Sequence, residues 1–312
     1  MGLAVAASTQ PERGTARPAA ASAMLLADGR LHLHHGPIDL VIGADGTPAA
    51  VKWAYRLAAA RFDTILDELV GELDLLRRPL CQTSCRPAGD VAARMWAASM
   101  GHLAHHNGAD YVTAMAAVAG AVADTVLAAM LDKARPRRAY VNNGGDIALW
   151  LTGAERFRTL VAGSDNAELA RITLTTADPA RGIATSGRHG RSLSRGIADA
   201  VTVLAQTAAE ADVAATMIAN AVDLPDHLAV LRVPACDLDP DSDLGQRQVV
   251  TDVGGLAGSD VTKALGRGGL LAEQMLGKGL ICGAALFLQG QSYIIDPVKT
   301  QFNQLGKTMQ YA

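Results

Sequence analysis

Residues 182–201, with the sequence GIATSGRHGRSLSRGIADAV, gather positive charge and hydroxyl groups into one short stretch. Arg188, Arg191 and Arg195 carry planar guanidinium groups that match phosphate or carboxylate, and the first acid after them is Asp199. The intervening serines add hydroxyl donors, and the glycines free backbone N–H groups for an anion. The stretch therefore predicts an anion-binding loop, and a solvated surface loop is the alternative.

A second group occurs at residues 142–147, NNGGDI, directly after a predicted strand. Paired glycines let the backbone approach a ligand closely or adopt positive φ, and the carboxylate of Asp146 accepts hydrogen bonds. The pattern is compatible with a ligand-binding turn. An ordinary β-hairpin turn explains the same residues, because Asn-Gly and Gly-Asp are common hairpin signals.

Asp212 and Thr216 form a third group within the helix expected for residues 210–223. A spacing of four residues places both side chains on one helix face. A carboxylate and a hydroxyl are ligands that Mg²⁺ accepts, with phosphate oxygens and water completing the octahedron. The alternative is that Asp212 only stabilises the helix start through the helix dipole.

The cysteines and histidines give weaker signals. Cys81 and Cys85 have C-x3-C spacing in a loop framed by prolines, but there is no second C-x-x-C, so ordinary thiols are favoured over a metal or redox pair. The histidine clusters lack an H-E-x-x-H pattern, so zinc is not expected. A pH-sensitive or substrate-binding role stays open for His102, His105 or His106.

The elements that must position these groups change character along the chain. Residues 30–44 alternate like paired strands around a Gly-Pro turn, and helices are expected at 47–76, 90–106 and 113–133. Strands and tight turns dominate from residue 138 onwards, apart from the helices at 210–223 and 260–276. This partial segregation predicts an α+β fold with a layered α/β/α architecture and a mixed, mostly antiparallel sheet.

Composition sets the domain organisation. We expect a disordered tail at residues 1–23, one domain at 24–300, and a C-terminal tail at 301–312. The polar, Gly- and Asp-rich segment 235–259 is expected to be an inserted loop or flap within the domain.

The net charge of −3 indicates neither a nucleic-acid partner nor an anionic-membrane binder. No apolar run reaches the roughly 18 residues of a membrane span. The N-terminus has no basic region ahead of an apolar one, so no secretory signal is indicated and a cytoplasmic protein is expected. The Ala-rich helices are compatible with a homodimer.

The three groups follow one another as NNGGDI, then ATSG, then AD-x3-T. This series resembles the ApbE-type flavin transferases, and it is more similar still to an uncharacterised branch of that superfamily. The branch resemblance also includes DLVIGA (39–44), AMAAVAGAVAD (114–124) and EADVAATMIANAV (210–222). It covers about residues 30 to 233 and again 277 to 296.

The resemblance implies an FAD or FMN pocket lined by Gly144, Gly145 and Asp146, with the ATSG turn (184–187) beside it. It implies Mg²⁺ ligands at Asp212 and Thr216. The reaction of the transferases moves FMN from FAD to a threonine or serine hydroxyl of a partner protein, with Mg²⁺ neutralising the pyrophosphate charge. The resemblance to the uncharacterised branch also implies a link to sulfur and homocysteine metabolism. A role of Cys81 and Cys85 in such chemistry is therefore worth testing.

One departure from the transferase pattern lies in the loop described first. The transferases carry a His-x-x-Asp-Pro segment and a Thr-Gly between ATSG and AD-x3-T, whereas this chain has HGRSLSRGIADAV there. We therefore expect an enzyme acting on a small anionic metabolite or nucleotide, with Asp146 and His189 as catalytic groups. The alternatives are a divergent Mg²⁺-dependent flavin transferase and a non-catalytic assembly partner of a redox enzyme. The ligand-binding residues expected are Asn143, Gly144, Gly145, Thr185, Ser186, Gly187, Arg188, Arg191, Ser192, Ser194, Arg195 and Asp199.

Overall fold

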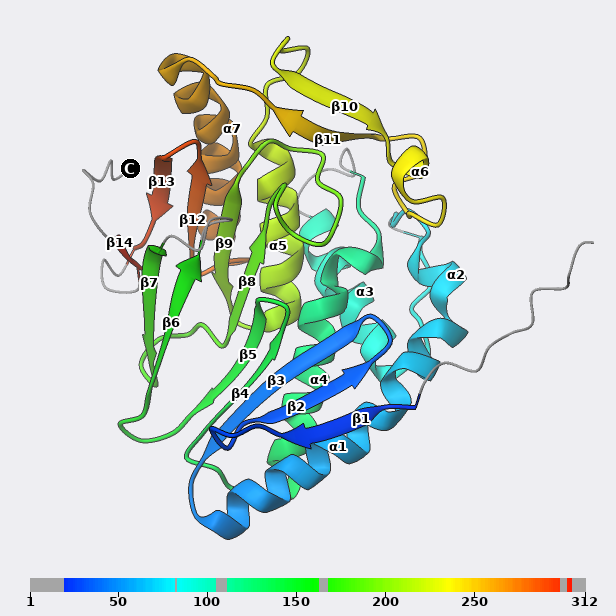
Figure 1. Ribbon diagram of the computed structural model, residues 1–312, viewed down its shortest axis with the longest axis vertical. Helices are drawn as coiled ribbons and strands as arrows, with labels where there is room; N and C mark the ends of the chain where they lie inside the picture. Colours follow the sequence, from blue (N-terminus) through cyan, green and yellow to red (C-terminus); the bar gives the residue numbers. More distant parts are fainter. Residues whose placement is uncertain (1–19, 82, 105–110, 163–167, 298–301, 305–312) are drawn as a thin grey trace, which may run out of the picture.

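The computed structural model describes residues 20–81, 83–104, 111–162, 168–297 and 302–304 (Figure 1). Most of the two predicted tails, together with His105 and His106, lie outside these ranges. The described helices are α1 (Pro48–Gly71), α2 (Leu73–Leu76), α3 (Asp90–Leu103), the 3-10 turn η1 (Ala114–Ala117), α4 (Val118–Lys133), α5 (Ala208–Ala221), α6 (Ala235–Leu238) and α7 (Gly258–Gly277).

The main sheet has nine strands in the order β1-β2-β3-β4-β5-β8-β9-β12-β13, and each described pair in it is antiparallel. In its first half, from β1 to β5, strands that follow one another in the chain are neighbours in the sheet, and helices α1 to α4 lie between β3 and β4. Its strands are β1 (Ser22–Leu25), β2 (Leu31–His35), β3 (Ile38–Asp45), β4 (Arg138–Asn143), β5 (Asp146–Leu151), β8 (Gly182–Ser186), β9 (Ala200–Ala205), β12 (Gly283–Leu288) and β13 (Gln291–Ile295).

The two faces of this sheet are covered differently. The long helices pack on one face, where alternate strand residues such as Leu40, Val141 and Val203 join their core (Figure 1). A three-stranded sheet covers part of the other face, and its strands are β6 (Arg156–Ala162), β7 (Glu168–Thr175) and β14 (Phe302–Gln304). Phe157 and Ile172 of this small sheet share a second core with main-sheet residues such as Ile183.

The predicted α+β class and the mostly antiparallel sheet are confirmed. The layering differs in one respect, because the described third layer is a β-sheet where the α/β/α prediction placed helices. The apolar faces of β6 and β7 provide that cover. Strand β14 also falls in the predicted C-terminal tail, where pairing of its backbone with β7 gives it regular structure.

Segment 235–259 is more regular than the predicted loop or flap. It contains α6 and β11 (Gln248–Val253), and β11 pairs with β10 (Val230–Pro234) as an antiparallel hairpin. Val249 is fully buried and Val253 nearly so, which anchors β11 despite its polar surroundings. The hairpin projects at the end of the molecule near the start of α7 (Figure 1).

Small residues bring α4 close to α5. A Cβ atom on Gly120 would lie 2.2 Å from the carbonyl oxygen of Ala208, so only glycine allows this approach. Residues Ala114–Lys133 are long and apolar enough by composition to cross a membrane, although Asp124 interrupts the apolar run. The stretch is 56% buried within the fold, as a core helix would be.

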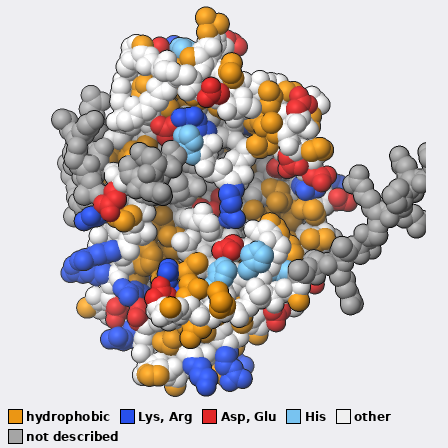
Figure 2. Space-filling view, viewed as in Figure 1, with side chains coloured by type: hydrophobic (Ala, Val, Ile, Leu, Met, Phe, Trp, Pro, Cys, Tyr) orange, Lys and Arg blue, Asp and Glu red, His pale blue; other side chains and the backbone are white. Residues whose placement is uncertain are grey.

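Basic, acidic and apolar side chains are interspersed on the face shown in Figure 2. Among the described hydrophobic residues, Leu228, two residues before β10, and Leu231 of β10 are 98% and 57% exposed. These two leucines therefore lie outside both hydrophobic cores.

Candidate functional site

The NNGGDI segment forms a two-residue hairpin turn between β4 and β5. Asn143 pairs with Asp146, and Gly144 and Gly145 adopt φ values of 65° and 114°. The side-chain Oδ1 of Asn142 accepts a hydrogen bond from the Gly145 N–H at 2.8 Å. The alternative prediction of a β-turn is thus correct, and the turn leaves Asp146 at the start of β5.

Asp146 and Asp212 lie close enough for their charges to interact. Asp146 is 9% exposed, and its Oδ1 accepts a hydrogen bond from the Thr185 N–H at 3.2 Å. Asp212, on α5, accepts one from the Gly120 N–H at 3.0 Å. Burial raises the pKa of Asp146 to about 7. The pKa of Asp212 is also raised, first by burial and then by the negative charge of Asp146.

Asn143 and Thr216 complete this region. The side-chain Nδ2 of Asn143 donates to the Ala119 carbonyl at 3.1 Å, which connects the hairpin to the start of α4. Thr216 is partly buried on α5, one turn after Asp212. No group of three His, Cys, Asp or Glu side chains suited to a metal ion occurs in the part of the chain that the structure describes.

A third buried acid, Asp124, was not among the predicted site residues. Its two carboxylate oxygens accept hydrogen bonds from the backbone N–H groups of Ala208 and Ala209 at 3.1 and 2.9 Å. Burial raises the pKa of Asp124 to about 6. The signal available in the sequence was an acid inside a run of alanine and valine, where an unpaired charge is costly. Asp124 ties α4 to the N-terminus of α5 and so fixes the helix that carries Asp212.

Arg191 is the arginine that the structure places at the Gly-Gly-Asp turn. A Cβ atom on Gly144 would lie 2.1 Å from Nη2 of Arg191, so the guanidinium rests directly against this glycine. The charge of Arg191 opposes the rise in the pKa of Asp146. Arg191 is exposed, and no carboxylate of the described residues lies within ion-pair distance of it.

Arg188 has a different role because Asp199 neutralises it. The Arg188 Nη2 and Nε atoms lie 2.7 and 2.9 Å from Oδ1 of Asp199. His189 Nε2 is 3.4 Å from the same oxygen, and Asp199 Oδ2 accepts from the Gln289 N–H at 2.6 Å. Asp199 thereby anchors the start of the loop and holds the imidazole beside it.

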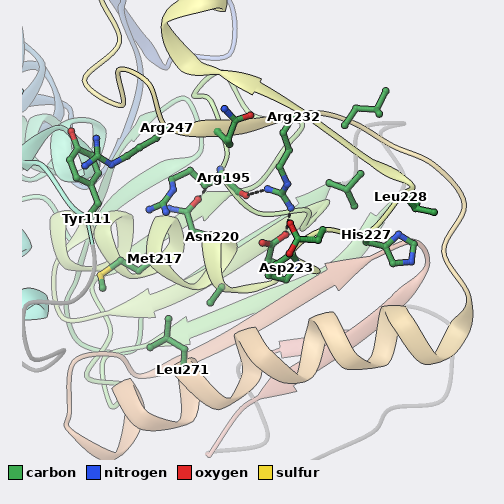
Figure 3. Close-up of a pocket in the computed structure, with 16 residues that line it drawn as sticks. Tyr111, Arg195, Met217, Asn220, Asp223, His227, Leu228, Arg232, Arg247 and Leu271 are labelled. Atoms are coloured by element: carbon green, nitrogen blue, oxygen red, sulfur yellow. Dashed lines mark hydrogen bonds and ion pairs between the residues drawn. The ribbon is translucent and has the colours of Figure 1, made fainter.

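Arg195 is also separate from the turn. It lines another cavity, together with Tyr111 and Arg247 (Figure 3). Ser194 is buried, and its hydroxyl donates to the Gly196 carbonyl at 3.0 Å. The structure therefore does not bring the three predicted arginines together at one anion, because Arg191 lies at Gly144, Arg188 is paired with Asp199, and the backbone of Arg195 is bonded to Asn220 of α5. Ser192 lies exposed between them.

A cavity of about 340 Å³ lies between the Gly-Gly-Asp turn and the loop. Its polar wall includes seven predicted site residues, namely Gly144, Gly145, Thr185, Ser186, Gly187, His189 and Asp199, together with Asn142, Thr159 and Thr202, which were not predicted. Its apolar wall includes Leu160, Val161 and Ile172 of the small sheet. The sequence predicted those strands but gave no sign that they face the site, since a strand pattern does not identify its packing partner. The cavity combines an apolar surface with hydrogen-bonding groups, as ligand pockets commonly do.

The remaining candidates lie elsewhere. Cys81 and Cys85 are exposed free thiols that line a cavity of about 290 Å³ beside α2 and α3. His102 is buried in α3, away from the residues that line the Gly-Gly-Asp cavity.

The sequence model of the family described as AbpE bacteria matches residues 23–294. A UPF0280 protein of Methanothermobacter thermautotrophicus is 34% identical over 173 residues, which are 54% of this chain and 64% of the relative. A UPF0280 protein of Methanococcoides burtonii is 39% identical over 111 residues, which are 35% of this chain and 46% of the relative. The match thus covers less than two thirds of either relative.

A solved structure titled Flavin Transferase ApbE from Vibrio cholerae aligns with 90% of this chain and 99% of its own, with a TM-score of 0.43 and 13% identity.

Proposed function

The chain belongs to the family described as AbpE bacteria, and from that premise we propose that it is an enzyme acting on a phosphate-bearing nucleotide at the Gly-Gly-Asp site, with Mg²⁺. A flavin nucleotide is our first candidate for the ligand, because the cavity has both apolar and hydrogen-bonding walls and because of the family. The observation that carries the proposal is the pair of Asp146 at the start of β5 and Asp212 on α5, two acids from separate elements whose charges interact and whose carboxylates accept hydrogen bonds from the backbone N–H groups of Thr185 and Gly120.

Two neighbouring carboxylates in a poorly solvated site repel each other when both are ionised. A proton on one of them relieves the repulsion, and so does a divalent cation between them. The donor set suits Mg²⁺, since Asp212, Thr216 and Asp146 offer carboxylate and hydroxyl oxygens only. When bound there, Mg²⁺ would neutralise the charge on phosphate oxygens of the nucleotide.

The anionic part of the ligand has a cation available on the other side of the turn. Arg191 rests on Gly144, its guanidinium has no carboxylate partner among the described residues, and its N–H groups match phosphate oxygens. The planar part of the ligand would lie in the cavity against Leu160 and Ile172. Thr185 and Ser186 supply hydrogen bonds at the polar wall.

His189 is the group that we assign to proton transfer. Its ring lies beside Asp199 and lines the cavity, and a carboxylate next to an imidazole orients the ring. The His189–Asp199 pair occurs in the loop that replaces the His-x-x-Asp-Pro segment of the transferases. Because Nε2 faces Asp199, Nδ1 is the nitrogen that would take the proton from a hydroxyl nucleophile. That oxygen would then bond to the FMN phosphorus of FAD, while the phosphorus–oxygen bond to AMP breaks and AMP leaves.

The experiment is a titration with FAD, followed by flavin fluorescence, with and without Mg²⁺. We expect Mg²⁺ to tighten FAD binding by the wild-type protein and to have little effect on Asp212→Asn. Asp132→Asn is the matched control, because Asp132 is an exposed acid at the end of α4. No FAD binding at about 100 μM with Mg²⁺ present, equivalent to a binding free energy weaker than about −5.5 kcal/mol, would contradict the flavin assignment.

A further inference from the structure

A cavity of about 850 Å³ lies beside the C-terminal half of α5, under the β10–β11 hairpin (Figure 3). Met217 of α5 and Leu271 of α7 give it an apolar side. Tyr111, Arg195 and Arg247 come together at one end of it (Figure 3). None of these residues lines the Gly-Gly-Asp cavity, so the two cavities have separate walls.

The backbone of Arg195 is held from both sides. Its N–H donates to Oδ1 of Asn220 at 3.0 Å, and its carbonyl accepts from Nη1 of Arg232 at 2.6 Å. Two residues further on, the Ile197 N–H donates to the Val222 carbonyl at 2.8 Å, and the preceding carbonyl, that of Ser194, accepts from the Val250 N–H at 2.8 Å. These bonds fix the point from which the Arg195 side chain extends, so a contact made by its guanidinium loses less conformational entropy.

Arg247, the residue before β11, reaches the same place. Its guanidinium carbon lies 3.3 Å from the centre of the Tyr111 ring, which holds it by a cation–π interaction. The charges of both arginines act on the Tyr111 phenol, because each opposes the rise in its pKa that burial causes. Two guanidinium groups are thus directed to one aromatic ring.

Asp223 and Asp226 also line the cavity, and the charge of Asp243 acts on Tyr111 together with the charges of the two arginines. Asp223 forms an ion pair with Arg232 on the other side of the cavity, and the side chains are only 18% and 19% exposed. Asp243 accepts a hydrogen bond from the Thr113 hydroxyl at 2.5 Å. Within the described ranges, no carboxylate lies at ion-pair distance from Arg195 or Arg247. Two like charges without a counter-ion attract an anion.

We propose that this cavity is a second binding site, which takes an organic anion with a carboxylate or phosphate group held by Arg195 and Arg247 and an apolar body packed against Met217 and Leu271. The apolar side of the cavity favours a molecule with a hydrocarbon or aromatic portion over a bare inorganic ion. The site is independent of the nucleotide site and does not rest on the function proposed above.

The test uses two fluorescent probes, 8-anilinonaphthalene-1-sulfonate and its uncharged analogue N-phenyl-1-naphthylamine. We expect saturable binding of the sulfonate, weakened about tenfold or more by Arg195→Met or by Arg247→Met, because hydrogen bonds to a charged group contribute about 1.5–3 kcal/mol. The uncharged analogue should bind these variants and the wild-type protein equally. Competition by octanoate and by octyl phosphate then identifies which oxyanion the site prefers.

Two control variants locate the probe. Arg56 lies over Trp53 at 5.5 Å on α1, so Arg56→Met removes an arginine stacked on an aromatic ring outside the cavity. Arg191→Met removes the cation of the nucleotide site. Both should bind the sulfonate like the wild-type protein, and thermal unfolding checks that all variants are folded. Sulfonate binding that is absent in the wild-type protein, that is unchanged in the Arg195 and Arg247 variants, or that is lost in Arg191→Met would overturn the proposal.

Discussion

The guanidinium of Arg191 rests on the backbone of Gly144, so that an added Cβ atom would lie 2.1 Å from Nη2. The contact joins the loop that follows β8 to the hairpin turn between β4 and β5. It also keeps a positive charge near Asp146, whose buried carboxyl has a pKa raised to about 7. A cation and an acid that changes its protonation near neutral pH thus meet at one turn.

Substitution of Gly144 by alanine should displace Arg191 and weaken FAD binding. Gly153 provides a matched control, because its φ of 56° is close to the 65° of Gly144 and a Cβ atom there meets nothing within 4 Å. Each variant should lose about 1 kcal/mol of unfolding free energy from the left-handed backbone. Only Gly144→Ala should lose affinity in an FAD titration. Equal affinities for the two variants would show that Arg191 does not contact the ligand.

Arg188 and Arg191, three residues apart, should respond in opposite ways to substitution by methionine. Arg188→Met leaves the partly buried Asp199 without its main partner, and we expect a loss of about 1–3 kcal/mol in urea unfolding. Arg191→Met should change stability by less than about 0.5 kcal/mol but weaken FAD binding about tenfold. If Arg188→Met lost affinity and kept its stability, the assignment of these two arginines would be reversed.

The stability of the metal-free protein should depend on pH through Asp146. Because the pKa of Asp146 is raised from 3.8 to about 7, the folded state holds a proton that the unfolded state releases. The contribution of Asp146 to the free energy of unfolding is therefore complete below about pH 4, and it is lost as the pH rises through about 7. The difference in the free energy of unfolding between the wild-type protein and Asp146→Asn should change by roughly 1–4 kcal/mol over that pH range.

Chemical denaturation at pH 5 and pH 8 checks this dependence, with Asp132→Asn as the exposed-acid control. Mg²⁺ should stabilise the wild-type protein more at pH 8 than at pH 5, because protonated carboxyls bind the ion poorly. A difference between wild-type and Asp146→Asn stability that does not vary with pH would contradict the raised pKa.

Several features of this site follow from local sequence alone. Two glycines before Asp146 predict a hairpin with positive φ, and a four-residue spacing predicts that Asp212 and Thr216 share a helix face. The order of these motifs predicted the ApbE-type resemblance, which the family match over residues 23–294 confirms. The roles of individual site residues stay predictions until they are tested by substitution.

The arrangement of the arginines could not be predicted in the same way. Charge alone made Arg188, Arg191 and Arg195 look equivalent. What separates them is Asp199, which folds back on the loop from the start of β9, and Asn220, which fixes the backbone of Arg195 from α5. These partners are defined by the three-dimensional path of the chain. The apolar composition of a strand likewise did not reveal that residues of β6 and β7 line the Gly-Gly-Asp cavity.

The close approach of α4 and α5 gives a further prediction about Gly120. A Cβ atom there would lie 2.2 Å from the Ala208 carbonyl oxygen, and backbone cannot move aside as a side chain can. Gly120→Ala should therefore lose about 2–4 kcal/mol of unfolding free energy. Gly266→Ala is the control, since a Cβ on that α7 residue meets nothing within 4 Å and should gain up to about 1 kcal/mol from helix propensity. Similar unfolding free energies for both variants in urea would mean that the two helices can separate without loss.

The thiol of Cys81 should be the fastest of the four cysteines to react with iodoacetamide. Its Sγ lies 3.3 Å from the Thr83 hydroxyl oxygen and 3.5 Å from that of Ser84, and these hydrogen bonds lower its pKa. Burial raises the pKa of Cys282 and of Cys236, so less of the reactive thiolate forms there near neutral pH.

Mass spectrometry of peptides taken during alkylation at pH 7.5 measures each rate separately. Thr83→Val and Ser84→Ala should each slow Cys81, because the thiolate loses a hydroxyl donor, and should leave Cys282 unchanged. Cys85 is exposed like Cys81 and serves as the internal control for accessibility. If Cys85 and Cys81 reacted at the same rate in the wild-type protein and in both variants, access of the reagent alone would set the reactivity of this loop.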